Sequence, residues 1–486
     1  MSRTVLVTGA TGYVGGRLVP ALLAAGGVTV RCLARTPEKL DDAPWRAAVE
    51  VVRGSVGGDL TDALGGVDTL VYLVHSIGQG EGWEARELDH ARNVADHARR
   101  AGVRRIVFLG GLGRDDDDLS VHLRSRHEVG RLLAGSGVPT VELRAGVIIG
   151  SGSASFEMLR YLVEMLPVMV TPRWVSTRCQ PIAIADVVTT LVRAVTLADI
   201  PAGVYELGGP DVVSYAEMMD AYAHAAGLPR RRVISVPFLT PGLSSHWVGL
   251  VTPVPVPLAR ELVESLVNEV VVDDDRAIRT FGVDAMGLAE AIERALAAVE
   301  RGNVPTAWSD ADLVHFAPVA TDPAWSGGTI VEDVRRATAA ASPRAVYRTI
   351  AAIGGDRGWY SGELLWRIRG ILDKLIGGPG LRTGRKPTIA VGDAIDFWRV
   401  EELVPDRRIR LRAEMVLPGQ AWLTWDLEPS DGGTVVTQSA TFRPRGLWGR
   451  AYWYGVAPFH RFVFPGMLAG IVADAAGRTT SPPEPG

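Results

Sequence analysis

The chain has 486 residues, of which 47% are hydrophobic and 22% are charged, and its formal net charge at pH 7 is -4. This length allows two to four domains, and the near-neutral charge argues against a dedicated nucleic-acid binder, which needs a basic surface. Only two cysteines are present, Cys32 and Cys179, which excludes a disulfide scaffold and a cysteine-ligated zinc site and makes a reducing cytoplasm the expected location. We expect neither a targeting segment at the N-terminus nor a membrane-spanning helix.

The first 150 residues alternate short apolar runs with helical patterns, which is typical of a parallel sheet covered by helices on both faces. Strands are expected at 4–8, 28–33, 49–53, 69–74, 105–109 and 140–147, with helices such as 13–25 and 84–101 between them. The predicted fold class is therefore α/β, a Rossmann-like doubly wound parallel sheet.

A glycine-rich turn joins the first expected strand to the first expected helix. Gly9 permits a tight turn, Gly12 lets the backbone approach a pyrophosphate, and Gly15 lets the helix pack closely on the strand. The helix that follows offers free N–H groups to the phosphates. The pattern predicts a dinucleotide site, as opposed to a merely tight turn, with contacts from Gly9, Thr11, Gly12, Tyr13, Val14 and Gly15.

Arg35 stands at the end of the second expected strand, about 20 residues after Gly15, where a carboxylate would bind the ribose diol of NAD. A guanidinium there can pair with a ribose 2′-phosphate, so NADP(H) is favoured over NAD(H) as cofactor. Arg31 lies in the same strand. The alternative is that Arg35 is a solvated charge at a strand end.

The glycine spacing, Thr8 and the segment from Gln180 to Asp186 resemble the atypical and extended short-chain dehydrogenase/reductases, in particular their NmrA-like, complex-I-subunit-like branch, over about the first 300 residues. The resemblance implies a Tyr-x-x-x-Lys pair on the helix after the fifth strand and a serine at the end of that strand. In this sequence His122 and Arg126 stand in place of the tyrosine and lysine, and no serine precedes them.

This substitution leaves two interpretations of the pair open. His122 can exchange a proton near neutral pH, whereas Arg126 stays charged and can only hold ribose or phosphate oxygens. The pair is then an altered acid site or a cofactor clamp. The alternative is a surface histidine on a helix that follows the acidic run 115–118 and is capped by Ser120.

His75 follows the fourth expected strand, where the nicotinamide is expected, so it is either a cofactor or substrate contact or an exposed loop residue. The remaining histidines show no spacing typical of metal ligands, and no metal is predicted.

The rest of the chain predicts a second domain. The first domain should reach residue 302, with substrate-side insertions within about 151–298, followed by a proline-containing linker at 303–323, a second domain at 324–477 and a disordered tail at 478–486. In the second domain, strands are expected at 395–404, 408–417, 421–428 and 434–442, after helices at 343–353 and 363–376. The segment 446–476 has a helical pattern that Pro458 and Pro465 interrupt.

This order of elements resembles the START-like (SRPBCC, helix-grip) superfamily, which implies an α+β fold with an apolar cavity for a hydrophobic small-molecule ligand. Aromatic residues are dense over 448–464, where Arg445, Arg450 and Arg461 are close by. These aromatic side chains form either ordinary core or an interfacial patch that makes peripheral membrane contact.

The leading functional hypothesis is an NADP(H)-dependent oxidoreductase or isomerase that acts on a hydrophobic carbonyl, enone or quinone-like molecule. The missing Tyr/Lys/Ser set also allows a non-catalytic NADP(H)-sensing or assembly protein. A third hypothesis is a lipid-binding carrier in which the nucleotide-binding half is a scaffold. The sequence does not indicate an oligomeric state.

Overall fold

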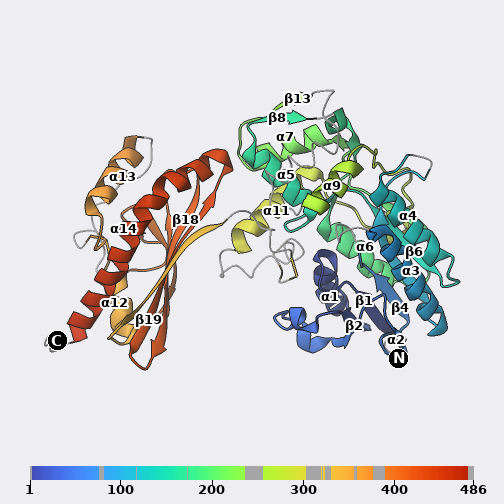
Figure 1. Cartoon of the computed structure of the whole chain (residues 1–486), viewed down its shortest axis with the longest axis horizontal. Helices are drawn as coiled ribbons and strands as arrows, with labels where there is room; N and C mark the ends of the chain where they lie inside the picture. The colour runs from blue at the N-terminus through green and yellow to red at the C-terminus, as the bar shows by residue number, and fades with distance from the viewer. Residues whose placement is uncertain are drawn as a thin grey trace. The chain divides into compact units, whose positions relative to one another are not determined.

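The structure is a computed structural model that describes residues 3–75, 82–115, 118–171, 173–235, 256–302, 319, 321–322, 330–354, 358–375 and 389–479. The chain divides into two compact units, Met1–Gly328 and Thr329–Gly486. Each unit has its own sheet (Figure 1).

The first unit is built on a seven-stranded sheet in the order β11-β6-β5-β4-β1-β2-β3, in which every neighbouring pair is parallel. Its strands are β1 (Arg3–Thr8), β2 (Val28–Ala34), β3 (Glu50–Arg53), β4 (Thr69–Tyr72), β5 (Arg105–Gly111), β6 (Thr140–Ala145) and β11 (Gly203–Leu207). The chain leaves β1 toward β2 on one side and later returns to β4 on the other. This reversal creates a switch point between β1 and β4, where ligands bind in doubly wound sheets. The predicted Rossmann-like class is confirmed.

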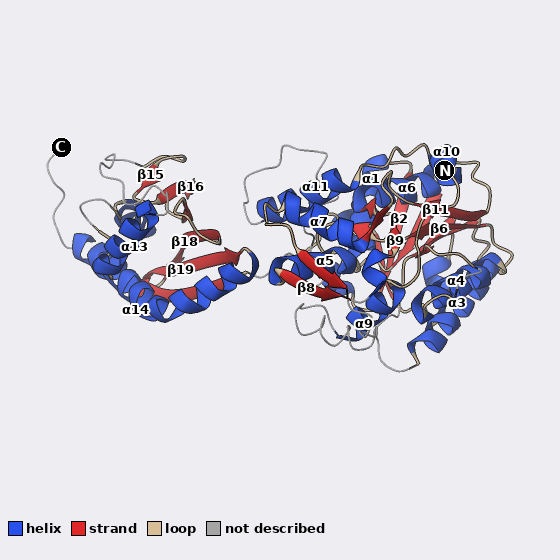
Figure 2. Cartoon of the chain, turned by 90° about the horizontal axis from the view of Figure 1, so that it is seen from above, coloured by secondary structure: helices blue, strands red, loops and turns tan. Residues whose placement is uncertain are grey.

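Helices cover both faces of this sheet (Figure 2). One face packs against α1 (Tyr13–Ala25) and α6 (Ile184–Thr196), and the other against α3 (Trp83–Arg100) and α4 (Val121–Ala134). Because both faces are buried, the strands consist of nearly continuous apolar runs rather than alternating ones.

Described segments between β6 and residue 302 form a helical layer with its own apolar core. Its helices are α5 (Ala154–Met165), α7 (Tyr215–Ala225), α9 (Val256–Ser265) and α11 (Leu288–Gly302). Helix α10 (Arg276–Phe281) packs instead on β11 and α6, in the core of the main sheet. Short strands complete the layer: β7 (Ile148–Ile149), β8 (Val168–Thr171), β9 (Arg178–Cys179), β10 (Ile182–Ala183), β12 (Val213–Ser214) and β13 (Arg232–Ser235).

A buried ion pair joins α1 to the end of the expected linker. The Arg17 guanidinium donates to both carboxylate oxygens of Asp322 at 2.5 and 2.9 Å, and their side chains are 1% and 6% exposed. Arg17 also donates to the carbonyl of Ser151 at 3.1 Å. Asp322 therefore belongs to the first unit, where it is paired with α1, the helix that begins at the glycine turn.

We expect Asp322→Ala to lower the free energy of unfolding of the first unit by about 3 kcal/mol, because it leaves the Arg17 charge buried and uncompensated. The urea midpoint, measured by circular dichroism, checks this. The matched control is Asp273→Ala, which removes the 2.7 Å ion pair to Arg114 whose side chains are 50% and 52% exposed. The control should cost less than about 1 kcal/mol. Equal losses for the two variants would contradict the prediction.

The second unit contains a six-stranded antiparallel sheet in the order β14-β19-β18-β17-β16-β15. Its strands are β14 (Val331–Ala339), β15 (Ala394–Ile395), β16 (Trp398–Val404), β17 (Arg408–Ala413), β18 (Gly419–Ser430) and β19 (Gly433–Pro444). Its helices are α12 (Pro343–Ala351), α13 (Glu363–Leu375) and α14 (Gly446–Thr479). The expected meander is present, and β14 is an additional edge strand. The sequence pattern misses β14 because Asp333 and Arg335, paired at 2.9 Å, occupy positions on one face where apolar residues would be expected.

The final helix, α14, runs without a break through Pro458 and Pro465, so the predicted interruptions are wrong. Each proline removes one helical hydrogen bond, but the buried side chains of Met467, Ile471 and Ala475 anchor the helix on the core. Among the described residues, the span from Gly446 to Gly477 is the one helix long and apolar enough to cross a membrane by length and composition alone. Apolar helices of folded cores meet the same criterion. The expected tail, 478–486, lies outside the described residues from 480 onward.

Candidate functional site

The glycine turn has the geometry that a phosphate-binding loop needs. Gly9 has a φ of +79°, and the Gly12 N–H donates to the Gly9 carbonyl at 2.9 Å. A Cβ at Gly15 would lie 2.2 Å from the Gly9 oxygen, so any side chain there would collide with backbone. The turn thus keeps the N-terminus of α1 open to a ligand because no side chain covers it.

Thr8 holds this turn at the switch point. Its hydroxyl donates to the Val71 carbonyl at 3.1 Å and accepts from the Leu73 N–H at 3.3 Å. The carboxyl ends of β1 and β4 are therefore tied together where the groove begins.

A groove with a volume of about 480 Å³ runs along this edge of the sheet. At one end it is lined by Arg35, Gly54 and Ser55, and at the other by His75, Gly111 and His122. All the predicted cofactor and catalytic positions line this one groove: Gly9, Thr11, Gly12, Tyr13, Val14, Gly15, Arg35, His75, His122 and Arg126. An open helix end, a turn that requires glycine at Gly9 and Gly15, and a long groove across the switch point fit a dinucleotide.

The two arginines of β2 differ in their surroundings. Arg31 is bound to Glu50 at 2.7 Å and to the carbonyls of Ala63 and Gly65, so its guanidinium is used within the fold. Arg35 is exposed and lines the groove beside Ser55. Only Arg35 of these two is placed to meet a ribose phosphate.

Arg126 is buried and held by three neighbours. Its guanidinium donates to Glu87 Oε1 at 2.5 Å, to the Leu109 carbonyl at 2.5 Å and, more weakly, to the Val74 carbonyl at 3.4 Å. Its Cζ lies 4.6 Å from the centroid of the Phe108 ring. Arg126 therefore joins the ends of β4 and β5 and places a fixed positive charge at the floor of the groove.

His122 lies one helical turn before Arg126, with its ring centroid 5.1 Å from that of His75. Burial first, and the Arg126 charge second, lower the pKa of His122 from 6.5 to about 3. Burial, Arg126 and His122 also lower the pKa of His75 well below 6.5. Both imidazoles are therefore neutral at physiological pH, and His122 Nδ1 is buried without a hydrogen-bond partner among the described residues.

The depressed pKa of His122 predicts a loss of stability in acid. In the unfolded chain this histidine takes up a proton near pH 6.5, whereas the folded protein resists protonation down to about pH 3. Its contribution to stability is thus complete above about pH 6.5 and lost progressively below it. We expect His122→Gln to reduce the drop in urea midpoint between about pH 7.5 and about pH 4.5. The exposed His224, changed to Gln, should leave that drop unchanged. A His122→Gln variant whose urea midpoint drops as much as that of the wild type would contradict the low pKa of His122.

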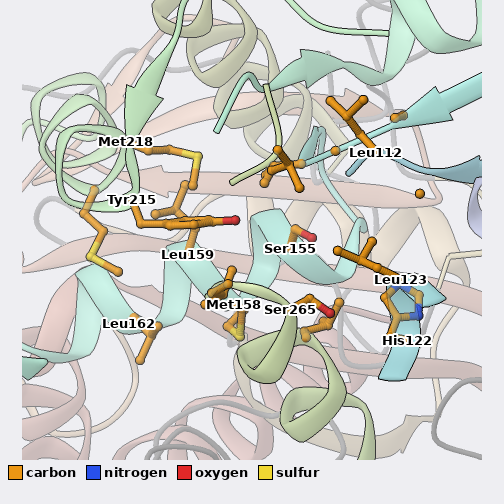
Figure 3. Close-up of a pocket in the computed structure, with 18 residues that line it drawn as sticks. Leu112, His122, Leu123, Ser155, Met158, Leu159, Leu162, Tyr215, Met218 and Ser265 are labelled. Carbon is orange, nitrogen blue, oxygen red and sulfur yellow. The ribbon is translucent and has the colours of Figure 1, made fainter. Parts of the chain in front are cut away.

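A second, apolar cavity lies beside the groove, and His122 is part of its lining (Figure 3). Its volume is about 100 Å³, and it shares Gly111, His122 and Ala145 with the groove. In Figure 3, His122 and Leu123 lie at one end and Tyr215, Met218 and Leu162 at the other. Helices α5, α7 and α9 contribute Met158, Leu159, Met219 and Leu262 to its walls, and Leu266 follows directly after α9.

The segment from Gln180 to Asp186, which carries part of the family resemblance, has a structural role. The Gln180 amide donates to the Gly209 carbonyl at 2.6 Å and accepts from the Val272 N–H at 3.0 Å. Asp186 accepts from the Met286 N–H at 3.0 Å, and burial raises the pKa of its carboxyl. These contacts fix the helical layer over the carboxyl edge of the sheet.

Glu87 and the lining of the apolar cavity are functional residues that were not predicted from the sequence. Glu87 is 1% exposed and shares the buried stripe of α3 with Trp83, Ala91, Val94 and Ala98. A carboxylate at an apolar helical position is a signal for a buried cation, so the periodicity of α3 contained this information. The methionines and leucines of the cavity have no such signal, because they are indistinguishable from core in the sequence.

Two family models match the chain. The family described as NAD(P)H-binding matches residues 9–144, and a family described as a protein of unknown function (DUF2867) matches residues 325–467. The first match spans the glycine turn and the strands that build the groove.

The first unit also resembles curated proteins. The (4-alkanoyl-5-oxo-2,5-dihydrofuran-3-yl)methyl phosphate reductase of Streptomyces griseus is 31% identical over 271 residues, which is 54% of this chain and 85% of that protein. The ceramide reductase of Caulobacter vibrioides is 29% identical over 258 residues, 51% of this chain and 78% of that protein. Among solved structures, the NADPH-dependent quinone oxidoreductase of Escherichia coli, in complex with NADPH, aligns at a TM-score of 0.50 and 22% identity over 59% of this chain and 98% of that chain.

Proposed function

The chain belongs to the NAD(P)H-dependent oxidoreductase family that includes the Streptomyces griseus phosphate reductase, and we propose that it uses NADPH to reduce an apolar carbonyl, enone or quinone-like molecule. The observation that carries the proposal is the position of His122, which lines both the dinucleotide groove and the adjacent apolar cavity. A substrate in the cavity would present its reactive end to the nicotinamide end of the groove.

The cofactor, when bound, supplies a hydride to the substrate carbon. In the reduction of a carbonyl, the carbon–oxygen π bond breaks, the oxygen gains negative charge and one proton must arrive there. We assign this proton donation to His122, because a neutral imidazole N–H can polarise a carbonyl and donate to the developing oxyanion. When the His122 N–H proton passes to the oxygen, His122 is left as an imidazolate, and this anion takes a proton back from water. Arg126, held by Glu87, adds a fixed positive charge that favours the anionic oxygen.

The walls of the cavity favour an uncharged substrate. Apart from His122, the polar side chains in its lining are Ser155, Ser265 and Tyr215, and no lysine or arginine lines it among the described residues. A phosphate there would be a buried, unpaired charge. We therefore propose a neutral substrate, in contrast to the phosphate named for the Streptomyces griseus relative.

Arg35 is expected to select NADPH over NADH. Arg35→Ala should raise the KM for NADPH by about ten- to one-hundred-fold, because a charge-assisted pair with the 2′-phosphate is lost, and should change the KM for NADH little. Initial-rate measurements with both cofactors check this. Arg92→Ala is the control, because Arg92 of α3 pairs with Asp89 at 2.8 Å, does not line the groove and should leave both values unchanged. Equal effects on the two cofactors would contradict the role of Arg35.

The direct test is the rate at which NADPH absorbance is lost when the chain is mixed with NADPH and a panel of enones, quinones and aliphatic ketones. Turnover with a neutral apolar acceptor supports the proposal. Cofactor binding without turnover on any acceptor, together with an NADPH-dependent protein partner, would instead support the sensing or assembly function that the missing Tyr/Lys/Ser set allows.

A second candidate function belongs to the second unit. Between its sheet and α13 and α14 lies an apolar cavity of about 320 Å³, lined by aromatic side chains such as Trp366, Trp398, Trp422 and Phe464. Trp398 Nε1, Trp422 Nε1 and His460 Nδ1 are buried without hydrogen-bond partners among the described residues. We propose that the second unit is START-like and carries an apolar ligand. The ligand would include an oxygen atom that accepts a hydrogen bond from one of these unpaired nitrogens. Native mass spectrometry of the purified chain tests this, and an empty second unit in every preparation would oppose it.

A further inference from the structure

Helix α14 presents an apolar face to solvent. Trp448, Tyr454 and Phe462 are 81%, 76% and 77% exposed. The other exposed positions of the same stripe include Ala451, Gly455, Pro458, Ala469 and Ala473. The steps along the stripe are three or four residues up to Phe462, seven residues to Ala469 and four residues to Ala473. Amphipathic surface helices normally carry charged residues on the face that points to solvent. The solvent-facing stripe of α14 instead carries aromatic and small apolar residues.

The charges in this segment all have one sign. Residues 445–473 contain Arg445, Arg450 and Arg461 and no aspartate or glutamate, although the whole chain carries a net charge of -4. A patch with aromatic side chains and three cations is complementary to an anionic lipid surface, where tryptophan and tyrosine prefer the interface and arginine meets the headgroups.

The rim of the apolar cavity in the second unit is continuous with this helix. Phe459 lines that cavity and is 50% exposed, and Leu365 and Ile368 of α13 line it and are 37% and 45% exposed. The inner side of α14 contributes further lining residues, including Trp453, Val456 and Val463. One helix thus forms the wall of the cavity on one side and the exposed aromatic stripe on the other.

We propose that the outer face of α14, defined by Trp448, Tyr454, Phe459 and Phe462, docks on an anionic membrane surface and gives the cavity of the second unit access to an apolar ligand in the bilayer. A second copy of the chain is a poorer occupant. A two-fold contact through this face would bring Arg450 and Arg461 of both copies together, and like charges oppose such a contact. This inference does not depend on the proposed reductase activity.

Flotation of the full-length chain with vesicles tests the proposal, using phosphatidylcholine with or without phosphatidylglycerol. The wild type should float with the anionic vesicles, and added salt should weaken the binding because the arginine contribution is screened. The triple variant Trp448→Ser, Tyr454→Ser, Phe462→Ser should bind at least about ten-fold more weakly, because it removes most of the apolar area available for insertion.

The matched control replaces two exposed isoleucines of the first unit, Ile234→Ser and Ile278→Ser, which are 51% and 55% exposed. The control should float like the wild type, and circular dichroism and NADPH binding should be unchanged in both variants.

A wild type that stays unbound, or a triple variant that floats as well as the wild type, would overturn the proposal. So would a concentration-dependent dimer that the triple variant abolishes in the absence of vesicle binding. A chain that binds vesicles but reduces no acceptor would leave this inference intact and reject only the reductase proposal.

Discussion

Gly15→Ala is expected to raise the Kd for NADPH by more than about one-hundred-fold, because the new Cβ would lie 2.2 Å from the Gly9 oxygen and 2.8 Å from the Ala10 Cα. Neither neighbour is a flexible side chain, so the turn itself must move. The N–H groups at the start of α1 would then no longer point at the pyrophosphate. Isothermal titration calorimetry with NADPH measures the effect.

Two further variants separate loss of binding from loss of folding. Gly65→Ala is the control, since the nearest atom to its new Cβ is 3.6 Å away, and it should bind NADPH like the wild type. Gly12→Ala meets only the Gly9 oxygen, at 3.2 Å, and is exposed on the groove, so it should fold normally and still bind NADPH more weakly. Wild-type affinity in a folded Gly15→Ala protein would refute the loop as the cofactor site.

His122→Phe is expected to lower kcat by about 100- to 10,000-fold while leaving the Kd for NADPH nearly unchanged. The phenyl ring keeps the volume of the side chain in the cavity and removes the N–H that meets the substrate oxygen. Rapid-mixing measurements of NADPH oxidation give the rate of the chemical step. A deuterium isotope effect on that step should become fully expressed, because hydride transfer becomes rate-limiting.

The pH profile of the wild type provides an independent test of His122. Since burial holds the pKa of this imidazole at about 3, kcat should show no ionisation of His122 between about pH 5 and about pH 8. His224→Phe, at an exposed position, is the matched control and should retain wild-type kcat. An unchanged kcat in His122→Phe would contradict this role of His122 and would indicate that His75 or water donates the proton.

The dinucleotide domain could be predicted because its signals are local. The glycine turn, the apolar strands and the caps depend on neighbours a few residues away, as with Ser120, whose hydroxyl accepts from the Leu123 N–H. The family match at residues 9–144 confirms the predicted NAD(P)H-binding domain. The same locality explains the errors in the second unit, because Pro458 and Pro465 break a helix by local rules and the core of that unit overrides them.

By itself, the sequence determined that a glycine-rich turn stands at Gly9–Gly15 between a strand and a helix, and that His122 and Arg126 lie one turn apart on a later helix. These features follow from backbone sterics and helical spacing. Only the tertiary structure decided what surrounds them. Glu87 lies 39 positions from Arg126, yet it locks that guanidinium and leaves His122 beside a buried positive charge. The protonation state of an imidazole depends on the charges and burial around it, and these arise when distant segments pack together.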